Sequence, residues 1–364
     1  MSLRLLLRRV RVSRISLGLT GLFLISTIVV AQNAAERPLQ NAEQSLVPHA
    51  TQQTSHEQSK EPQSSEPKAE DQQPQQGQQD QETPRLANYD QAIFQKPIPS
   101  DQLAFLNRFA GGSANDLVRD KRFRKLMRNA LPDCMFHYGH DMPLIDAIEI
   151  VLKGSSQPVQ LRDGRYLLVS GHSGPYLLGR GFVWFDLKDG IALGGFYFHP
   201  TNGEPTPAVN IFSRQVKEEY LTLGQLPPAF AEDLSQWSTE SSVPPVTTRY
   251  FITGENRKIL LEHDEDYCNG AGTRSANGCE QMNADAADID MNAAYYLEQT
   301  NHATNATAWM ITGEDQVAWL RVRDNTCRIG FDPLRCHIRI TRERVHVIIR
   351  RHPVVHIPVH TSRR

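Results

Sequence analysis

The sequence predicts an α+β protein, in which an antiparallel β-meander domain with flanking helices precedes a small disulfide-bonded α-helical hairpin domain. Residues 165–213 carry short runs of aromatic and β-branched residues separated by Gly, Pro and Asp-Gly, which is typical of consecutive strands. Residues 284–327 instead place apolar residues at helical spacing. Most of the cysteines lie in or around this second stretch, so we expect disulfides to stabilise its helices.

Helices are expected before the strands. Asp101–Phe109 and Ala114–Ala130 have the spacing of short amphipathic helices. Another helix is expected to begin at Asp141 or Met142, with Pro143 in its first turn, and to end before Gly154. The second segment also carries a basic face that we interpret as solvated surface, formed by Lys121, Arg122, Arg124, Lys125 and Arg128.

The meander is expected to contain four strands: Arg165–Ser170, Gly181–Asp186, Ile191–His199 and Ala208–Ser213. Asp189-Gly190 favours a tight primed turn, because this dipeptide tolerates positive φ. Gly194-Gly195 suggests a β-bulge in the third strand. A helix over Leu226–Trp237 and a hairpin of Arg249–Thr253 with Lys258–Glu262 are expected to follow.

The N-terminus has the pattern of an export signal. Several arginines precede an uncharged apolar run from Ile15 to Ala31, and Val29-x-Ala31 offers small residues for cleavage. We expect residues 1–31 to be a signal peptide or an uncleaved N-terminal membrane anchor. The chain beyond it is then periplasmic or secreted, with membrane contact only through that anchor.

Composition divides the rest of the chain. Residues 32–91 are rich in Gln, Glu, Pro and Ser, which predicts a disordered tether. We expect an α+β domain of unknown role over 92–250, a helical domain over 251–350 and a mobile basic, His-rich tail over 351–364. The formal net charge of −2 gives no indication of nucleic-acid binding, and no cofactor is expected.

The cysteines of the helical domain, Cys268, Cys279, Cys327 and Cys336, are expected to be oxidised after export. Four cysteines allow three pairings, and the sequence alone does not choose among them, although the short loops favour sequential pairing. Helices over Ala284–Gln299 and Glu314–Cys327 are expected to pack as an antiparallel hairpin. Such packing would bring Cys279 and Cys327 to the same end.

These helices also carry an ordered motif. Asp288-x-x-Met291-Asn292-x-x-Tyr295 is followed by Trp319-x-x-x-Arg323-Asp324-x-x-Cys327, and then by Cys336-x-x-x-x-Thr341-x-x-Arg344. The pattern, over roughly residues 264–350, resembles the lysozyme-inhibitor LprI-type family of small secreted bacterial domains. The glycine-rich loop of residues 269–278 departs from the more helical segment of that family. The resemblance implies a non-catalytic, protein-binding task at the cell envelope, with a lysozyme as the candidate partner.

Two roles are expected for the polar residues of this domain. Asn292, Arg323 and Asp324 are interpreted as a hydrogen-bonded network that fixes helix register, with Trp319 and Tyr295 as core anchors. Contacts with a basic partner are expected instead from an acidic cluster that also includes Glu262 and Asp290. Its candidate binding residues are Asp264, Glu265, Asp266, Asp285 and Asp288, for which an ordinary solvated face is the alternative interpretation.

Two short segments suggest alternatives to a protein-binding function, one enzymatic and one metal-binding. Gly171-His172-Ser173-Gly174-Pro175 approaches a nucleophile elbow but lies between expected strands, so we interpret it as a turn. Cys134, His137 and His140 could centre a metal site, which would make the protein an envelope metal-binding protein or metalloenzyme. The alternative for Cys134 is a buried free thiol. The histidines of the C-terminal tail are interpreted as part of a mobile extension.

Overall fold

The computed structural model of this chain describes residues 89–155, 157–173, 179–199, 207–269, 276–351 and 354–359. The expected signal or anchor, and the expected tether up to residue 88, lie outside these residues. Every described element belongs to one compact unit, within residues 79–364. None of the helices in the described ranges has the length and apolar character that a membrane span requires.

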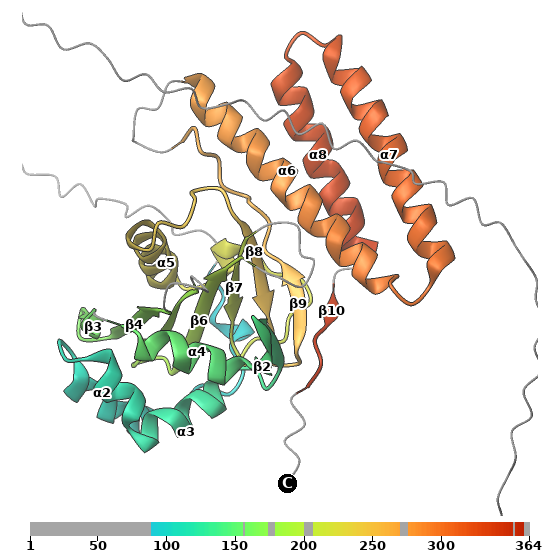
Figure 1. Ribbon diagram of the computed structural model, residues 1–364. Coiled ribbons are helices and arrows are strands. Elements are labelled where there is room, and N and C mark those ends of the chain that lie inside the picture. Colours follow the sequence, from blue (N-terminus) through green and yellow to red (C-terminus); the bar gives the residue numbers. More distant parts are fainter. Residues whose placement is uncertain are drawn as a thin grey trace, which may run out of the picture. The chain divides into compact units, whose positions relative to one another are not determined.

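An eight-stranded sheet in the order β10-β9-β8-β7-β6-β5-β4-β3 forms the centre of this unit (Figure 1). Its strands are β3 (Gln160–Arg162), β4 (Tyr166–His172), β5 (Arg180–Asp186), β6 (Ile191–Phe198), β7 (Ala208–Phe212), β8 (Thr248–Ile252), β9 (Arg257–Leu260) and β10 (Val355–His356). The predicted α+β class and the four strands of the meander are confirmed. Neighbouring strands are antiparallel except β7 and β8, which are parallel because the chain crosses over between them.

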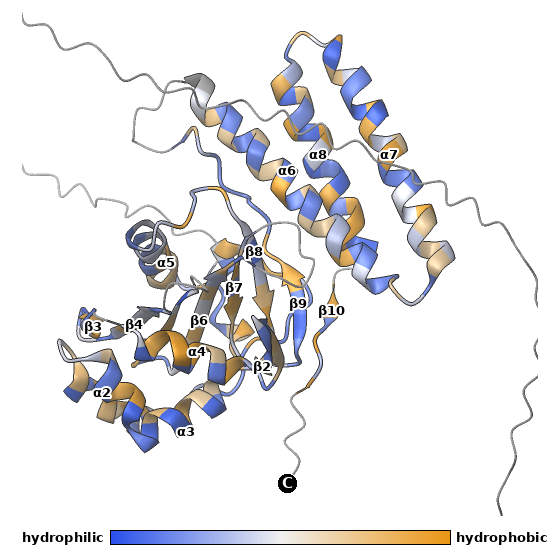
Figure 2. Ribbon diagram, in the orientation of Figure 1, coloured by the Kyte–Doolittle hydropathy of each residue, from blue (hydrophilic) through white to orange (hydrophobic). Residues whose placement is uncertain are grey.

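Helices cover both faces of the sheet. They are α1 (Ser100–Leu103), α2 (Ala114–Arg119), α3 (Lys121–Ala130), α4 (Leu144–Lys153) and α5 (Pro228–Glu240), with short 3-10 helices at Gln91–Ile93, Ala104–Phe109 and Leu223–Gln225. Side chains alternate along each strand, so Val183 and Phe185 join the core under α2, α3 and α4. Phe182 and Trp184 join the opposite core under α5. Figure 2 shows the hydrophobic character of the sheet and of α4.

The expected start of α4 is wrong. Residues Met135–Tyr138 and His140–Pro143 form the antiparallel hairpin of β1 and β2, which turns at Gly139 with φ of +73°. Pro143 is therefore the extended N-cap residue, and the helix begins at Leu144. The backbone N–H of Leu144 donates to Cys134 O at 3.0 Å, which ties the helix start to the beginning of the hairpin.

Two expectations about glycines need correction. Only Gly190 of the Asp189-Gly190 pair has positive φ, at +68°, and the turn closes through its N–H to Asp186 O over 2.9 Å. The hairpin is confirmed, but the turn is not a two-residue primed turn. Gly194-Gly195 forms no bulge, because the pairing of β6 with β5 continues through both residues. A Cβ at Gly194 would lie 2.1 Å from the Phe212 ring, so close ring packing explains this glycine.

The helical domain consists of α6 (Ala276–Asn301), α7 (Ala306–Arg328) and α8 (Pro333–Arg351). α6 and α7 run antiparallel, but they do not pack on each other as expected, because α8 lies between them and packs along α6 (Figure 1). Tyr250 and Leu260 of the sheet share a core with Met291, Leu297 and Ile348 of the helices. The helices are therefore packed directly on β8 and β9.

The expected start of the helical domain, and the tail expected beyond its end, both belong to the sheet. The boundary at residue 250 cuts β8, which spans Thr248–Ile252. In the expected mobile tail, Val355 pairs with Lys258 of β9, and Met135 N donates to Pro358 O at 2.9 Å. The described tail residues 354–359 therefore contain the edge strand β10 and are not a mobile extension.

Candidate functional site in the helical domain

Two disulfides close one end of the helical domain. Cys268 pairs with Cys279, and Cys327 pairs with Cys336, which confirms the sequential pairing. The first bridge ties the segment before α6 to that helix, and the second ties the end of α7 to the start of α8. Arg335 lies at the same end, where its Nη2 is 2.9 Å from Glu280 Oε1.

The motif residues converge on one buried guanidinium. Arg323 of α7 is 9% exposed, and its Nη1 donates to Asp288 Oδ1 of α6 at 3.0 Å and to Thr341 Oγ1 of α8 at 3.3 Å. Its Nε donates to Asp324 Oδ1 at 2.9 Å. One side chain thus connects all three helices, and an arrangement of this kind fixes their register. His337 of α8, which the motif does not include, also contacts Asp288 Oδ1 at 2.9 Å.

The aromatic residues of the motif support this network. The guanidinium carbons of Arg323 and Arg344 lie 5.2 and 5.7 Å from the centre of the Trp319 ring, so the indole attracts both cations. Trp319 and Tyr295 are partly buried against the core that also contains Met291. Asn292 is exposed and has no part in the hydrogen bonds described for the network, contrary to its expected role.

The structure does not gather the acidic residues into one free surface. Glu262 and Asp290 are buried, at 7% and 3% exposure. Asp290 Oδ2 accepts from His263 N at 2.7 Å, and Glu262 Oε2 lies 3.1 Å from His346 Nδ1. Burial, together with nearby Asp290, raises the pKa of Glu262. These two carboxyl groups therefore serve the interior rather than a partner.

The remaining carboxylates differ in their partners. Glu265 pairs with Arg249 at 2.9 Å, and Asp288 with Arg323. Asp266 accepts hydrogen bonds from Cys268 N and from Asn283 Nδ2, which fixes the loop beside the first disulfide. Asp264 and Asp285 are the exposed members with the weakest ties to the fold, since Asp285 accepts only from the neighbouring Gln281 in the hydrogen bonds described.

An apolar face on α7 was not anticipated from the sequence. The residues that α7 buries are Gln316, Arg323 and Cys327, whereas large apolar side chains remain exposed. Val322 is 64% exposed, and Ile329 in the following loop is 83% exposed. The other exposed apolar residues of this region are Trp309, Met310, Ile311, Val317 and Phe331. Ile311, Ala318, Val322 and Ile329 follow one helical stripe, a spacing that could have indicated this face.

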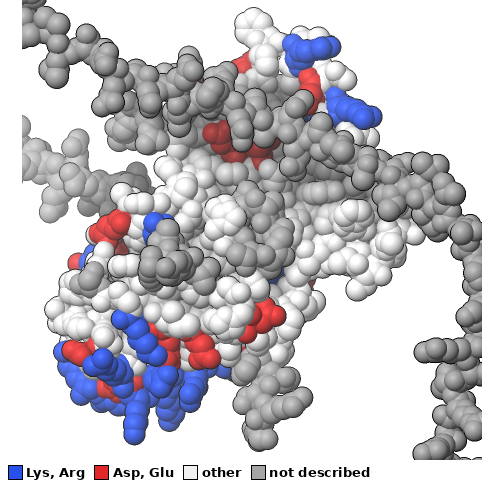
Figure 3. Space-filling view, viewed as in Figure 1, with Lys and Arg blue, Asp and Glu red and all other residues white. Residues whose placement is uncertain are grey.

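A basic face covers α3 in the first part of the unit. Figure 3 shows lysines and arginines gathered there. As expected, the basic residues of α3 are exposed. Arg124 Nε donates a hydrogen bond to Glu149 Oε1 at 2.8 Å. Arg122 binds Asp120, the residue that caps this helix. These pairs are typical of a solvated surface.

The candidate metal ligands Cys134 and His137 lie on opposite faces of β1, because side chains alternate along the strand. Cys134 is a free thiol that is only 1% exposed and lies in the core with Phe136 and Tyr138. His137 lies on the opposite face of the strand, where its Nδ1 is 2.9 Å from Asp141 Oδ1. His140 is exposed on β2. Within the described ranges, no three His, Cys, Asp or Glu residues are grouped as metal ligands.

Ser173 lies in the connection between β4 and β5, as expected for a turn. Its backbone N–H donates to Gly179 O at 2.9 Å, and its hydroxyl is hydrogen-bonded to the hydroxyl of Tyr138. The position is therefore not the strand-to-helix turn that a nucleophile elbow requires. Residues 174–178 of this connection lie outside the described part of the chain.

Comparisons with known proteins add no relative to this structural description. No protein-family model, no curated protein and no solved structure matches this chain.

Proposed function

We propose that this chain is an exported, non-catalytic protein whose helical domain binds a protein partner at the cell envelope, with a lysozyme as the candidate. The observation that carries the proposal is the exposed apolar face of α7, which includes Val322 and Ile329. Apolar side chains clustered on one helix are typical of a surface that a partner covers. The motif residues on the other face of α7 hold this helix in place.

The disulfides and the expected cellular compartment are consistent with this proposal. Two disulfides in a small helical domain fit an oxidising compartment, such as the periplasm or the outside of the cell. The proposed export depends on the signal pattern in residues 1–31. Electrostatic attraction to a cationic lysozyme is a smaller part of the proposal, because most carboxylates of the acidic cluster have partners within the chain.

The test measures binding of the exported chain to c-type lysozyme by interferometry, together with lysozyme activity against bacterial cell walls. We expect binding that is lost in Val322→Glu and Ile329→Glu, because each change places a charge on the apolar face. Ile150→Glu is the matched control, since Ile150 is an exposed apolar residue of α4, at 44% exposure. Absence of both binding and inhibition, or equal binding by all three variants, would contradict the proposal.

A further inference from the structure

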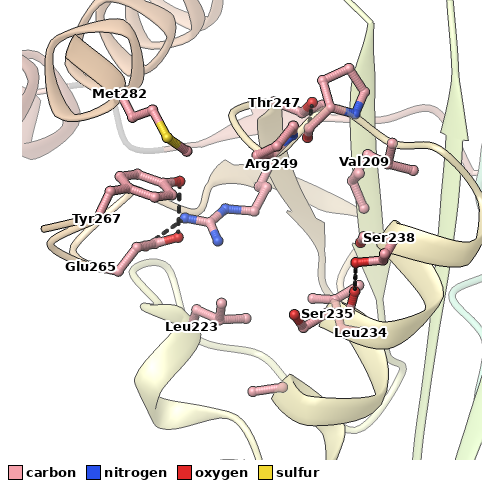
Figure 4. Close-up of a pocket in the computed structure, with 15 residues that line it drawn as sticks. Val209, Leu223, Leu234, Ser235, Ser238, Thr247, Arg249, Glu265, Tyr267 and Met282 are labelled. Carbon is pink, nitrogen blue, oxygen red and sulfur yellow. Dashed lines mark hydrogen bonds and ion pairs between the residues drawn. The ribbon is translucent and has the colours of Figure 1, made fainter. Parts of the chain in front are cut away.

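A cavity of about 380 Å³ lies between α5 and the segment that joins β9 to α6 (Figure 4). Its apolar wall contains Val209 of β7, Leu223, and Leu234 of α5. Met282 of α6 lies at the opposite side, and its unbranched side chain adapts to ligands of different shape. The volume and the mostly apolar wall are within the range of small-molecule sites.

One charged side chain extends into this cavity. Arg249 projects from β8 between Glu265 and Tyr267 on one side and Leu223, Leu234 and Ser235 on the other (Figure 4). Its side chain is 12% exposed, and one terminal nitrogen, Nη2, donates to Glu265 Oε2 at 2.9 Å. The Tyr267 hydroxyl donates to the other oxygen of Glu265 at 3.3 Å.

The guanidinium keeps unused hydrogen-bonding capacity. Arg249 Nε is buried and makes no hydrogen bond with any residue that the structure describes. A buried N–H without an acceptor is costly, and most such groups in proteins have partners. Nε itself is shielded from a water-sized atom, so a ligand would bring its acceptor oxygen to the terminal nitrogen Nη1, for which no hydrogen bond to a described residue is found.

The charges of Arg249 and Glu265 determine which kind of acceptor group a ligand can bring to this cavity. Although burial opposes ionisation, the charge and hydrogen bond of Arg249 lower the pKa of Glu265 to about 2. The pair is therefore ionised on both sides at neutral pH and has no net charge. A carboxylate ligand would lie near the Glu265 carboxylate and be repelled, whereas a neutral carbonyl oxygen would not.

We propose that this cavity binds a small, uncharged and largely apolar molecule whose carbonyl oxygen accepts hydrogen bonds from Arg249. The apolar body of the ligand contacts Val209, Leu234 and Met282, and its carbonyl group lies beside the Arg249 and Glu265 pair. The cavity and the exposed apolar face of α7 share no residues. Ligand binding in the cavity therefore does not depend on the proposed binding of lysozyme.

The test uses a matched pair of probes, 4-phenylbutanamide and 4-phenylbutanoate, with the full exported chain at pH 7. Saturation-transfer NMR and a competition titration measure their affinities. For probes of this size we expect the amide to bind with a dissociation constant of about 1 mM and the carboxylate about tenfold more weakly. Equal or tighter binding of the carboxylate would overturn the charge argument and with it the proposed ligand class.

Three variants locate the site. Ser238→Leu adds volume to the α5 wall and leaves the ion pair intact, so it should abolish amide binding. Arg249→Met combined with Glu265→Gln removes both charges together, which avoids an unpaired buried charge and should also abolish binding. Gln236→Leu is the control, because Gln236 is exposed on α5 and lies outside the cavity wall. No amide binding by the unmodified chain, or unchanged binding by both cavity variants, would overturn the proposal.

Discussion

Asp290 of α6 accepts two hydrogen bonds from His263, one from the backbone N–H at 2.7 Å and one involving ring Nδ1 at 2.7 Å. Both side chains are almost fully buried, at 1% exposure for His263 and 5% for Asp290. The contact fixes the chain directly after β9 onto the first helix of the helical domain. The sheet and the helices are thus joined by a polar contact as well as by a shared apolar core.

Replacing Asp290 with Ala should lower the free energy of unfolding by about 2–4 kcal/mol, because the buried N–H groups of His263 lose their acceptor. Urea unfolding of the full chain measures the change. Asp285→Ala is the control on the same helix, since Asp285 is exposed and should change stability by less than about 0.5 kcal/mol. Equal midpoints for the two variants would contradict the structural role of Asp290.

The disulfides should each contribute measurable stability. The bridges span sequence separations of 11 and 9 residues, and loops of this size stabilise a fold by about 2–3 kcal/mol through restriction of the unfolded chain. Replacing Cys327 and Cys336 together with Ser should lower the unfolding free energy by this amount. Non-reducing peptide mapping provides the check on pairing, and a fragment that joins Cys279 to Cys327 would contradict the structure.

Much of the fold follows from local sequence patterns, because alternation and turn residues specify β4 to β7 directly. The parallel pairing of β7 and β8 could not be predicted in this way, since it depends on how α5 packs across the sheet. The β1 and β2 hairpin was missed because its residues contain both a strand pattern and a proline that suggests a helix start.

The site was predicted less completely than the fold. Arg323 and Asp324 were expected in a network, but its partners Asp288 and Thr341 were not, and Asn292 has no part in it. The pairing of Glu265 with Arg249 was missed because no motif or periodic pattern links these two residues. The acidic cluster looked continuous in the sequence, but burial of Glu262 and Asp290 is decided by the packing of α6 and α8 against the segment that follows β9. Tertiary contacts of this kind leave no periodic signal.

Cys134 should be unreactive in the folded protein. Burial raises the pKa of its thiol to about 12, and the thiolate is the form that reacts with alkylating agents. We expect no iodoacetamide labelling of Cys134 at pH 8 in native protein and complete labelling in urea, followed by mass spectrometry. Rapid labelling of the native chain, or metal-dependent protection of this thiol, would instead favour an accessible or metal-bound cysteine.

The Arg249 and Glu265 pair should make stability depend on acid pH. The pKa of Glu265 is lowered from 4.5 to about 2, so its stabilising contribution is present above pH 4.5 and is lost as pH falls towards 2. Glu265→Gln should therefore be less stable than the unmodified chain at pH 7, and the difference should shrink between pH 4.5 and 2. Urea midpoints across this range measure it, and a constant difference would refute the linkage.

Gly194→Ala should destabilise the sheet. Its new Cβ would lie 2.1 Å from a ring carbon of Phe212, and this ring is fully buried in the core under α4. Overpacking of this kind typically costs about 1–3 kcal/mol, because rings and strands must shift. Gly278→Ala is the matched control, since its Cβ would meet no atom of the described residues within 4 Å. Calorimetry should find a lower melting temperature for Gly194→Ala and an equal or higher one for Gly278→Ala, because Ala favours the helix. If Gly194→Ala melts at the temperature of the unmodified chain, ring packing is not the reason for this glycine.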